Sequence, residues 1–150
     1  TRCEKISPTN SVVGIDLGLH NFIASSNGLL IKGKVVKSIN PYYNKQLAKY
    51  KSLAKKDNGS DHTNRIKRLH RIRYNKIHDY FHKCSRKVID HCIQNHIEMI
   101  LIEYNELWKQ KCNLGKLNNQ NFVQVPFYKL VHLIKYKAEL KGIKVKKITE

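Results

Sequence analysis

Two short apolar runs that each end in a carboxylate constrain the fold of this chain more than any other feature. Residues 12–16 read Val-Val-Gly-Ile-Asp, and residues 99–103 read Met-Ile-Leu-Ile-Glu. Runs of this length are typical of buried strands, and the long helical pattern between them favours parallel pairing through a helical crossover. We therefore expect Asp16 and Glu103 to end two strands of one α/β sheet.

The segment after the first run predicts a three-stranded meander. Residues 20–25 form the expected second strand, and Asn27-Gly28 indicates a tight hairpin in which both positions accept positive φ. Residues 29–39 return as the third strand, with Gly33 as a bulge or bend. Three consecutive strands with short connections most simply pair antiparallel.

A basic helical insertion is expected at about residues 44–95. Asn40-Pro41 breaks the sheet pattern, and Thr63 can cap a long helix over residues 64–95. The second half of this helix carries an apolar stripe at spacings of three and four. Its members are Ile77, Phe81, Cys84, Val88 and Cys92.

The last part of the chain predicts one more helix and one more strand. Pro126 suits the first turn of the helix, Gly142 ends it, and residues 144–148 form the strand. The buried stripe of this helix is expected to be Phe127, Leu130, Val131, Ile134 and Ala138. The order of elements therefore predicts a mixed five-stranded sheet with flanking helices.

The net charge points to a polyanionic partner. Lys and Arg total 29 against 11 acids, a formal charge of +18, which repels itself unless a polyanion neutralises it. Nucleic acid is favoured over an anionic membrane surface, because no apolar run approaches the ~18 residues that span a bilayer.

Almost half of the basic residues lie in the expected insertion. Between Lys45 and Lys87 there are fourteen Lys and Arg against three Asp. The candidate phosphate contacts are Arg65, Lys67, Arg68, Arg71, Arg73, Lys76, Lys83, Arg86 and Lys87. The alternative is a solvated helix, although the scarcity of acids leaves few intrahelical ion pairs to explain the charge.

Asp16 and Glu103 are the candidate metal ligands. If their strands are neighbours, the two carboxylates face each other across about 4.8 Å. Two anions that close repel unless a cation lies between them, and hard oxygen ligands suit Mg²⁺ or Mn²⁺. Two-metal phosphodiester hydrolysis needs such an arrangement. The alternative is that Asp16 forms a turn and Glu103 is solvated.

Other candidates carry weaker signals. His78 and His82 stand one helical turn apart, but two ligands fall short of a zinc site. The four cysteines, at positions 3, 84, 92 and 112, form no CxxC pair and are expected to be reduced thiols of a cytoplasmic, nucleoid-associated protein without a secretory leader. Trp108 with Lys109 and Gln110 could stack on a base, or the Trp could fold back onto the domain.

Several motifs resemble the RuvC nuclease domain of transposon-encoded TnpB-like proteins, which are related to type V CRISPR nucleases. They are GIDLG at 14–18 with HNFIA at 20–24, FHKCSRK at 81–87, WKQ at 108–110, NNQNFVQ at 118–124 and YKAE at 136–139. The resemblance spans residues 12–150, and five motifs in this order are far more specific than any one of them.

The resemblance implies an RNase H-like fold and an RNA-guided, Mg²⁺-dependent DNA endonuclease with DNA and guide RNA as partners. It assigns the first catalytic Asp to Asp16 and the catalytic Glu to Glu103, both as metal ligands. Because relatives often read Glu-Asp-Leu where this chain has Glu103-Tyr104-Asn105, Glu106 is the fallback acid.

The resemblance also implies that residues 1–150 form an incomplete nuclease domain. The chain has no initiator Met, and the family continues into a zinc ribbon and a third catalytic Asp. We therefore expect no zinc within this chain and no cleavage by it alone. The rival functions are a catalytically inactive RNase H-like nucleic-acid-binding module and a basic structural protein of a ribonucleoprotein.

Overall fold

The computed structural model describes residues 12–57, 63–103 and 125–148. Its elements in chain order are β1 Val12–Leu17, β2 Asn21–Ser25, β3 Leu30–Lys32, α1 Lys34–Asp57, α2 Asn64–Gln94, β4 Met99–Glu103, α5 Phe127–Leu140 and β5 Lys144–Ile148. The five strands form one sheet in the order β3-β2-β1-β4-β5. The first three strands pair antiparallel, whereas β4 lies parallel to both β1 and β5. The expected mixed sheet is confirmed.

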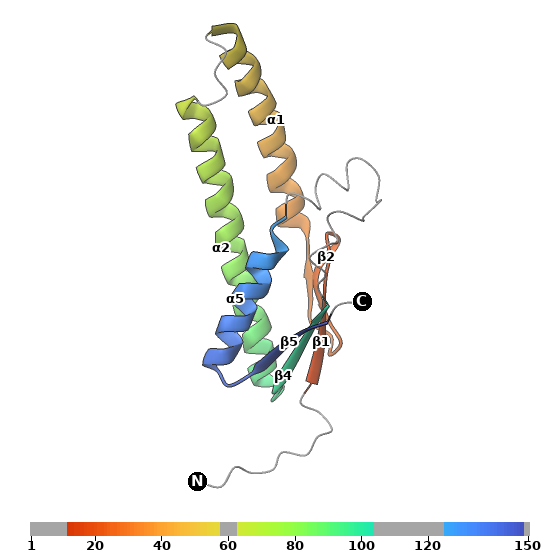
Figure 1. The fold of residues 1–150 in the computed structure, drawn as a ribbon. Coiled ribbons are helices and arrows are strands. Elements are labelled where there is room, and N and C mark those ends of the chain that lie inside the picture. The colour runs from red at the N-terminus through yellow and green to blue at the C-terminus, as the bar shows by residue number, and fades with distance from the viewer. Residues whose placement is uncertain (1–11, 58–62, 104–124, 149–150) are drawn as a thin grey trace.

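The hydrophobic core lies between one face of this sheet and the helices α2 and α5 (Figure 1). Alternate residues of β1 are buried, Val13, Ile15 and Leu17 among them. The ring of Phe22 on β2 stands 5.6 Å from that of Phe81 and 5.9 Å from that of Phe127, measured between centroids. All the residues of the two predicted helical stripes are buried, so their spacing identified both covering helices.

The expected third strand is wrong over most of its length. β3 contains only Leu30–Lys32, and residues 34–39 belong to α1, which begins ten residues before the expected helix and continues through Pro41. Buried Val36, Asn40 and Tyr43 follow one another at spacings of four and three, the helical period. The β-branched residues of this segment favour a strand in isolation, but packing against α2 decides otherwise.

Gly33 joins the two elements directly and is not a bulge within a strand. Its amide donates to the carbonyl of His20 at 3.0 Å, and its own carbonyl accepts from the amide of Lys37 in the first turn of α1. A Cβ at position 33 would lie 1.9 Å from the carbonyl oxygen of Leu19. Only glycine allows the chain to pass from β3 into α1 at this distance.

The β2–β3 hairpin also differs from expectation. Its loop is residues 26–28: the amide of Ser25 donates to the Leu29 carbonyl, and the amide of Gly28 donates to the Ser25 carbonyl. Gly28 has φ of 99°, but Asn27 is not among the residues with positive φ. The turn is therefore the longer type that ends in a left-handed glycine, not a two-residue turn.

Candidate metal centre and nucleic-acid surface

Asp16 and Glu103 are partners in the register of β1 and β4. These strands run parallel at the centre of the sheet, and the pairing proceeds from Val12 with Met99 to Asp16 with Glu103. The two residues therefore lie at the carboxyl ends of neighbouring strands, whose backbones are about 4.8 Å apart. The condition that the sequence left open, adjacency of the two strands, is met.

The two acids lie on the face of the sheet opposite the core. Since Ile15 and Leu17 point into the core, Asp16 between them points the other way, and it is exposed. Glu103 follows the buried Ile102 and is half-buried. Among the described residues, no Lys or Arg forms a salt bridge with Asp16.

The chemistry of this pair fits a hard divalent cation. Carboxylate oxygens are the ligands that Mg²⁺ and Mn²⁺ prefer, and a cation between Asp16 and Glu103 would relieve their mutual repulsion. Within residues 12–57, 63–103 and 125–148, no third His, Cys, Asp or Glu joins them. The fallback acid Glu106 lies outside the described residues.

Two lysines that were not among the sequence-based candidates lie on the same face of the sheet as Asp16 and Glu103. In the parallel pair β4–β5, Leu101 stands opposite Lys146 and Met99 opposite Lys144, and partners in register point to the same side. Both lysines are exposed. The signal was present in the sequence: Lys144 and Lys146 alternate with Val145, the period of a half-buried strand.

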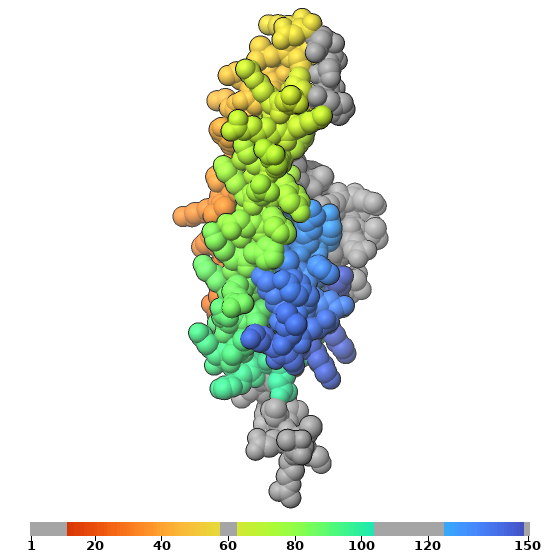
Figure 2. Space-filling view, turned by 90° about the vertical axis from the view of Figure 1, so that its left-hand side faces the viewer, coloured from red at the N-terminus to blue at the C-terminus, as the bar shows by residue number. Residues whose placement is uncertain are grey.

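The helices α1 and α2 form a hairpin that extends beyond the sheet (Figure 1). Thr63 caps α2 as expected, because its side chain accepts a hydrogen bond from the amide of Ile66. Figure 2 shows α5 against the lower part of α2 only, so that the upper part of α2 stands clear. Five of the six basic candidates in this upper part, residues 64–76, are exposed: Arg65, Lys67, Arg68, Arg71 and Lys76.

Arg73 is the exception among the basic residues of the hairpin. Its guanidinium lies 4.9 Å from the centre of the Tyr43 ring, and its Nε donates to Oδ1 of buried Asn40 at 3.1 Å. Burial lowers the pKa of Arg73, opposed by Tyr43. The residue joins α1 to α2, which the sequence could not reveal.

The basic candidates in the lower part of α2 have acidic neighbours. Lys83 pairs with Asp79 at 2.8 Å, and Arg86 pairs with Asp90 at 3.6 Å, each one helical turn apart and exposed. Such pairs contribute about 0.3–0.5 kcal/mol and partly offset the positive charge. Lys87 is exposed. The candidates Trp108, Lys109 and Gln110 lie outside the described residues.

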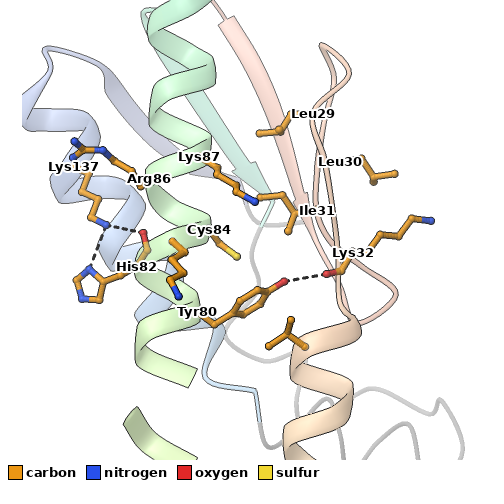
Figure 3. A pocket seen from close by; sticks show the side chains of 12 residues that line it. Leu29, Leu30, Ile31, Lys32, Tyr80, His82, Cys84, Arg86, Lys87 and Lys137 are labelled. Atoms are coloured by element: carbon orange, nitrogen blue, oxygen red, sulfur yellow. Dashed lines mark hydrogen bonds between the residues drawn. The ribbon is translucent and has the colours of Figure 1, made fainter. Parts of the chain in front are cut away.

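A hollow of about 850 Å³ lies between β3 and α2 (Figure 3). Its lining combines aliphatic residues such as Leu30 and Val35 with Lys32, Lys83 and Lys87, and it contains no Asp or Glu. Tyr80 spans the base of the hollow and donates from its hydroxyl to the Lys32 carbonyl at 3.0 Å. This hollow is separate from the carboxylate pair.

A polar cluster links α2 to α5. Nζ of Lys137 donates to Oγ of buried Ser85 at 2.8 Å. It also donates to the carbonyl of His82 at 3.1 Å (Figure 3). Burial and the neighbouring Lys137 and His78 lower the pKa of His82, and burial and Arg86 lower the pKa of Lys137. His78 and His82 stand 3.0 Å apart between their Nε2 atoms.

The cysteines that the structure describes are buried thiols. Cys84 and Cys92 are free and buried, and burial raises the pKa of Cys84 and brings that of Cys92 to about 11. Both therefore behave as small core residues and not as nucleophiles. Cys3 and Cys112 lie outside the described residues.

Comparison with protein families settles the relationship of the chain. A family described as "probable transposase", OrfB_IS605, matches residues 2–109. The chain belongs to this family. No curated protein matches it significantly. The expected resemblance to TnpB-like transposon proteins is thereby confirmed.

Solved structures place this transposase-family chain in the RuvC-like fold. One similar structure, a Cas12f1–sgRNA–target DNA complex, has a TM-score of 0.59 and 16% identity over 91% of this chain and 35% of that one. A CRISPR–Cas12f ternary complex has a TM-score of 0.62 and 19% identity over 92% of this chain and 28% of that one. The chain thus spans about a third of the length of these relatives and shares their fold.

Among the described residues of this family member, no helix combines the length and the apolar character needed to span a membrane.

Proposed function

We propose that this transposase-family chain is the nuclease module of an RNA-guided, metal-dependent DNA endonuclease encoded by a transposable element. The observation that carries the proposal is the register pairing of Asp16 with Glu103 at the carboxyl ends of two central parallel strands. Family membership supports a role in transposition, and the RuvC-like fold supports nuclease chemistry.

The proposed reaction is hydrolysis of a phosphodiester bond. Asp16 and Glu103 would hold Mg²⁺ or Mn²⁺, which in two-metal sites activates the attacking water and stabilises the leaving oxygen. Asp16 and Glu103 would fix the position of the ions, and the ions would neutralise the negative charge of the two carboxylates. The exposed Lys144 and Lys146 on the same face would hold a phosphate backbone across the carboxylates.

DNA and a guide RNA are the proposed partners. Two structurally similar proteins were solved with sgRNA and target DNA or as a ternary complex. In this chain the α1–α2 hairpin offers an exposed basic surface that would follow a phosphate backbone and dominate the affinity. Chemistry and affinity would then reside in different parts of the molecule.

Metal binding by the chain tests the carboxylate pair directly. Titration with Mn²⁺, followed by the electron paramagnetic resonance signal of the free ion, should reveal a weak site that Asp16→Asn and Glu103→Gln each remove. Asp90→Asn is the matched control, since Asp90 is an exposed carboxylate on α2. Unchanged Mn²⁺ binding in both site variants would exclude this pair as the metal centre.

Cleavage tests the complete proposal. In the complete endonuclease of which this chain is the proposed nuclease module, supplied with its guide RNA, Asp16→Ala should abolish cleavage and leave DNA binding nearly unchanged. A variant that still cuts at the original rate removes Asp16 from the mechanism. If the unaltered protein binds nucleic acid but neither holds Mn²⁺ nor cuts, the inactive binding module is the correct function.

A further inference from the structure

A groove between α1 and α2 differs in character from the rest of the hairpin. One wall comes from α1, where Tyr42, Gln46 and Tyr50 follow at intervals of four residues and thus share one face of the helix. The opposite wall comes from α2 and carries Arg65, Arg68 and Lys76, with Leu69 and Ile72 between them. The groove has a volume of about 420 Å³ and adjoins a second hollow of about 280 Å³ that shares Tyr42, Leu69, Ile72 and Lys76.

Of the two tyrosines that line this groove, Tyr42 is open to a ligand and Tyr50 is half-buried. Tyr42 is 59% exposed and Ile72 is 39% exposed, although both are large apolar groups. Nζ of Lys76 lies over the Tyr42 ring at 6.0 Å from its centre, the outer limit of a cation–π contact. An exposed aromatic and aliphatic surface beside cations offers a flat contact on which a base can stack.

The neighbouring Tyr43 shows what a structural tyrosine looks like on the same helix. Tyr43 is 8% exposed, its hydroxyl lies 2.6 Å from Nδ1 of His70, and the guanidinium of Arg73 covers its ring. Its contacts are satisfied within the hairpin. Tyr42, one residue earlier, points into the groove, so packing between α1 and α2 does not account for it.

The charge of the groove selects an anion. Three of the eight lining residues are cations, and none of the eight is Asp or Glu. The ligand must therefore combine negative charge with flat apolar surface. Nucleotides have both, and bases stack on exposed aromatic side chains in a sequence-tolerant manner.

We propose that this groove binds a short unpaired segment of nucleic acid, with bases on Tyr42 and Tyr50 and phosphates at Arg65 and Arg68. The inference rests on the proposed nucleic-acid function and adds to it a preference for unpaired strands. The two rings are eight residues apart, about 12 Å along the helix axis, too far to clamp one base between them. Each ring therefore takes its own base, which a duplex cannot supply because its bases are stacked inside.

Two fluorescein-labelled probes test the preference: a twelve-nucleotide oligo(dT) and a twelve-base-pair duplex, each titrated at fixed salt and followed by anisotropy. The double variant Tyr42→Leu/Tyr50→Leu should bind oligo(dT) at least about 30-fold more weakly, the smallest loss expected when two bases no longer stack. Affinity for the duplex should change less than about twofold, and the salt dependence should stay constant, since every phosphate-binding cation is still present.

Three controls make the result specific. Tyr42→Phe/Tyr50→Phe keeps the rings and should bind oligo(dT) as the unaltered chain does. Tyr128→Leu removes a tyrosine that is 55% exposed on α5, outside the groove, and should leave both probes unaffected. Circular dichroism and a urea midpoint establish that each variant is folded.

The outcomes separate this inference from the proposed function. If the unaltered chain binds neither probe at low salt, the nucleic-acid function fails and the groove proposal fails with it. Alternatively, the unaltered chain binds both probes, while the double variant Tyr42→Leu/Tyr50→Leu keeps its affinity for both or loses affinity for both equally. That result overturns the groove proposal alone. Loss of oligo(dT) binding in the Phe variant would likewise exclude stacking as its cause.

Discussion

The two halves of α2 belong to one continuous helix yet face different surroundings. Residues 77–92 bury seven side chains against the sheet and α5, and their acids Asp79 and Asp90 pair with basic neighbours. Residues 64–76 bury only Ile66 and Leu69 and contain no acid. The lower half thus serves stability, and under the proposed function the exposed cations of the upper half serve affinity. Substitutions of buried residues and of exposed cations should therefore affect different properties.

The largest effect on the free energy of unfolding is expected when a core side chain in the lower half of α2 is truncated. Phe81 is 1% exposed and packs on Phe22, so Phe81→Ala should lower the free energy of unfolding by about 3–5 kcal/mol. Leu53→Ala, on the projecting part of α1 where Leu53 is 42% exposed, should lower it by less than about 1 kcal/mol. Urea denaturation measures both. Similar losses in the two variants would contradict the division.

An intermediate effect distinguishes two arginines of the upper half. Arg73→Gln removes the bond to buried Asn40 and the packing on the Tyr43 ring, which should lower the free energy of unfolding by about 1–3 kcal/mol. Replacing the exposed Arg68 and Arg71 by Gln should change it by less than about 0.5 kcal/mol each.

In nucleic-acid binding, replacing Arg68 and Arg71 should have a larger effect than replacing Arg73. For the pair Arg68 and Arg71, the slope of log affinity against log salt should decrease by about two, roughly one for each phosphate that the variant no longer neutralises. For Arg73→Gln the slope should remain nearly constant. A slope unchanged by the double replacement would show that this face of α2 points away from the nucleic acid.

The smallest effect concerns pH. The pKa of His82 is lowered from 6.5 by burial and by Lys137 and His78, against the opposing charge of Asp79. The unfolded chain therefore takes up this proton first, and stability is lost as pH falls below about 6.5 toward the folded pKa. His82→Gln should make the free energy of unfolding less dependent on pH between about 7 and 5 than in the unaltered chain.

A second histidine variant provides the reference for the pH measurement. The chain has eight histidines, so the difference between variants is informative and the slope of one variant is not. His91→Gln removes another histidine of α2, which bonds to Asn27 and not to Lys137. If both variants flatten the pH profile equally, the cluster around Lys137 is not its source.

Periodicity predicted the elements whose surroundings are uniform. The runs that became β1 and β4 are short and continuously apolar, and the stripes of α2 and α5 keep one spacing over several turns. The start of α1 failed because residues 35, 36 and 39 are β-branched, which favours a strand locally, while their burial follows a helical period. Such conflicts are decided by tertiary packing, which local propensity does not contain.

The candidate site was predictable where it depends on strand ends and unpredictable where it depends on packing between helices. That Asp16 and Glu103 each end a strand could be read from the sequence, and their adjacency required the sheet order. The packing of Arg73 on Tyr43 could not be anticipated, since it joins residues thirty positions apart. The spacing of Tyr42 and Tyr50 was visible, but only the groove gives it meaning.

The direct junction at Gly33 has a mechanical consequence. α1 leaves β3 without a flexible linker, and a hydroxyl on α2 clasps the last residue of that strand through the Tyr80–Lys32 bond. The α1–α2 hairpin is therefore attached to the sheet at two points, the Gly33 junction and the Tyr80–Lys32 hydrogen bond. If nucleic acid binds the far end of the hairpin as proposed, a pull on it would act on the edge strand β3, which lies two strands from the one that bears Asp16. A side chain at position 33 would shift the α1–α2 hairpin relative to Asp16 and Glu103. The shift would change where a nucleic-acid strand bound to the hairpin meets the two carboxylates.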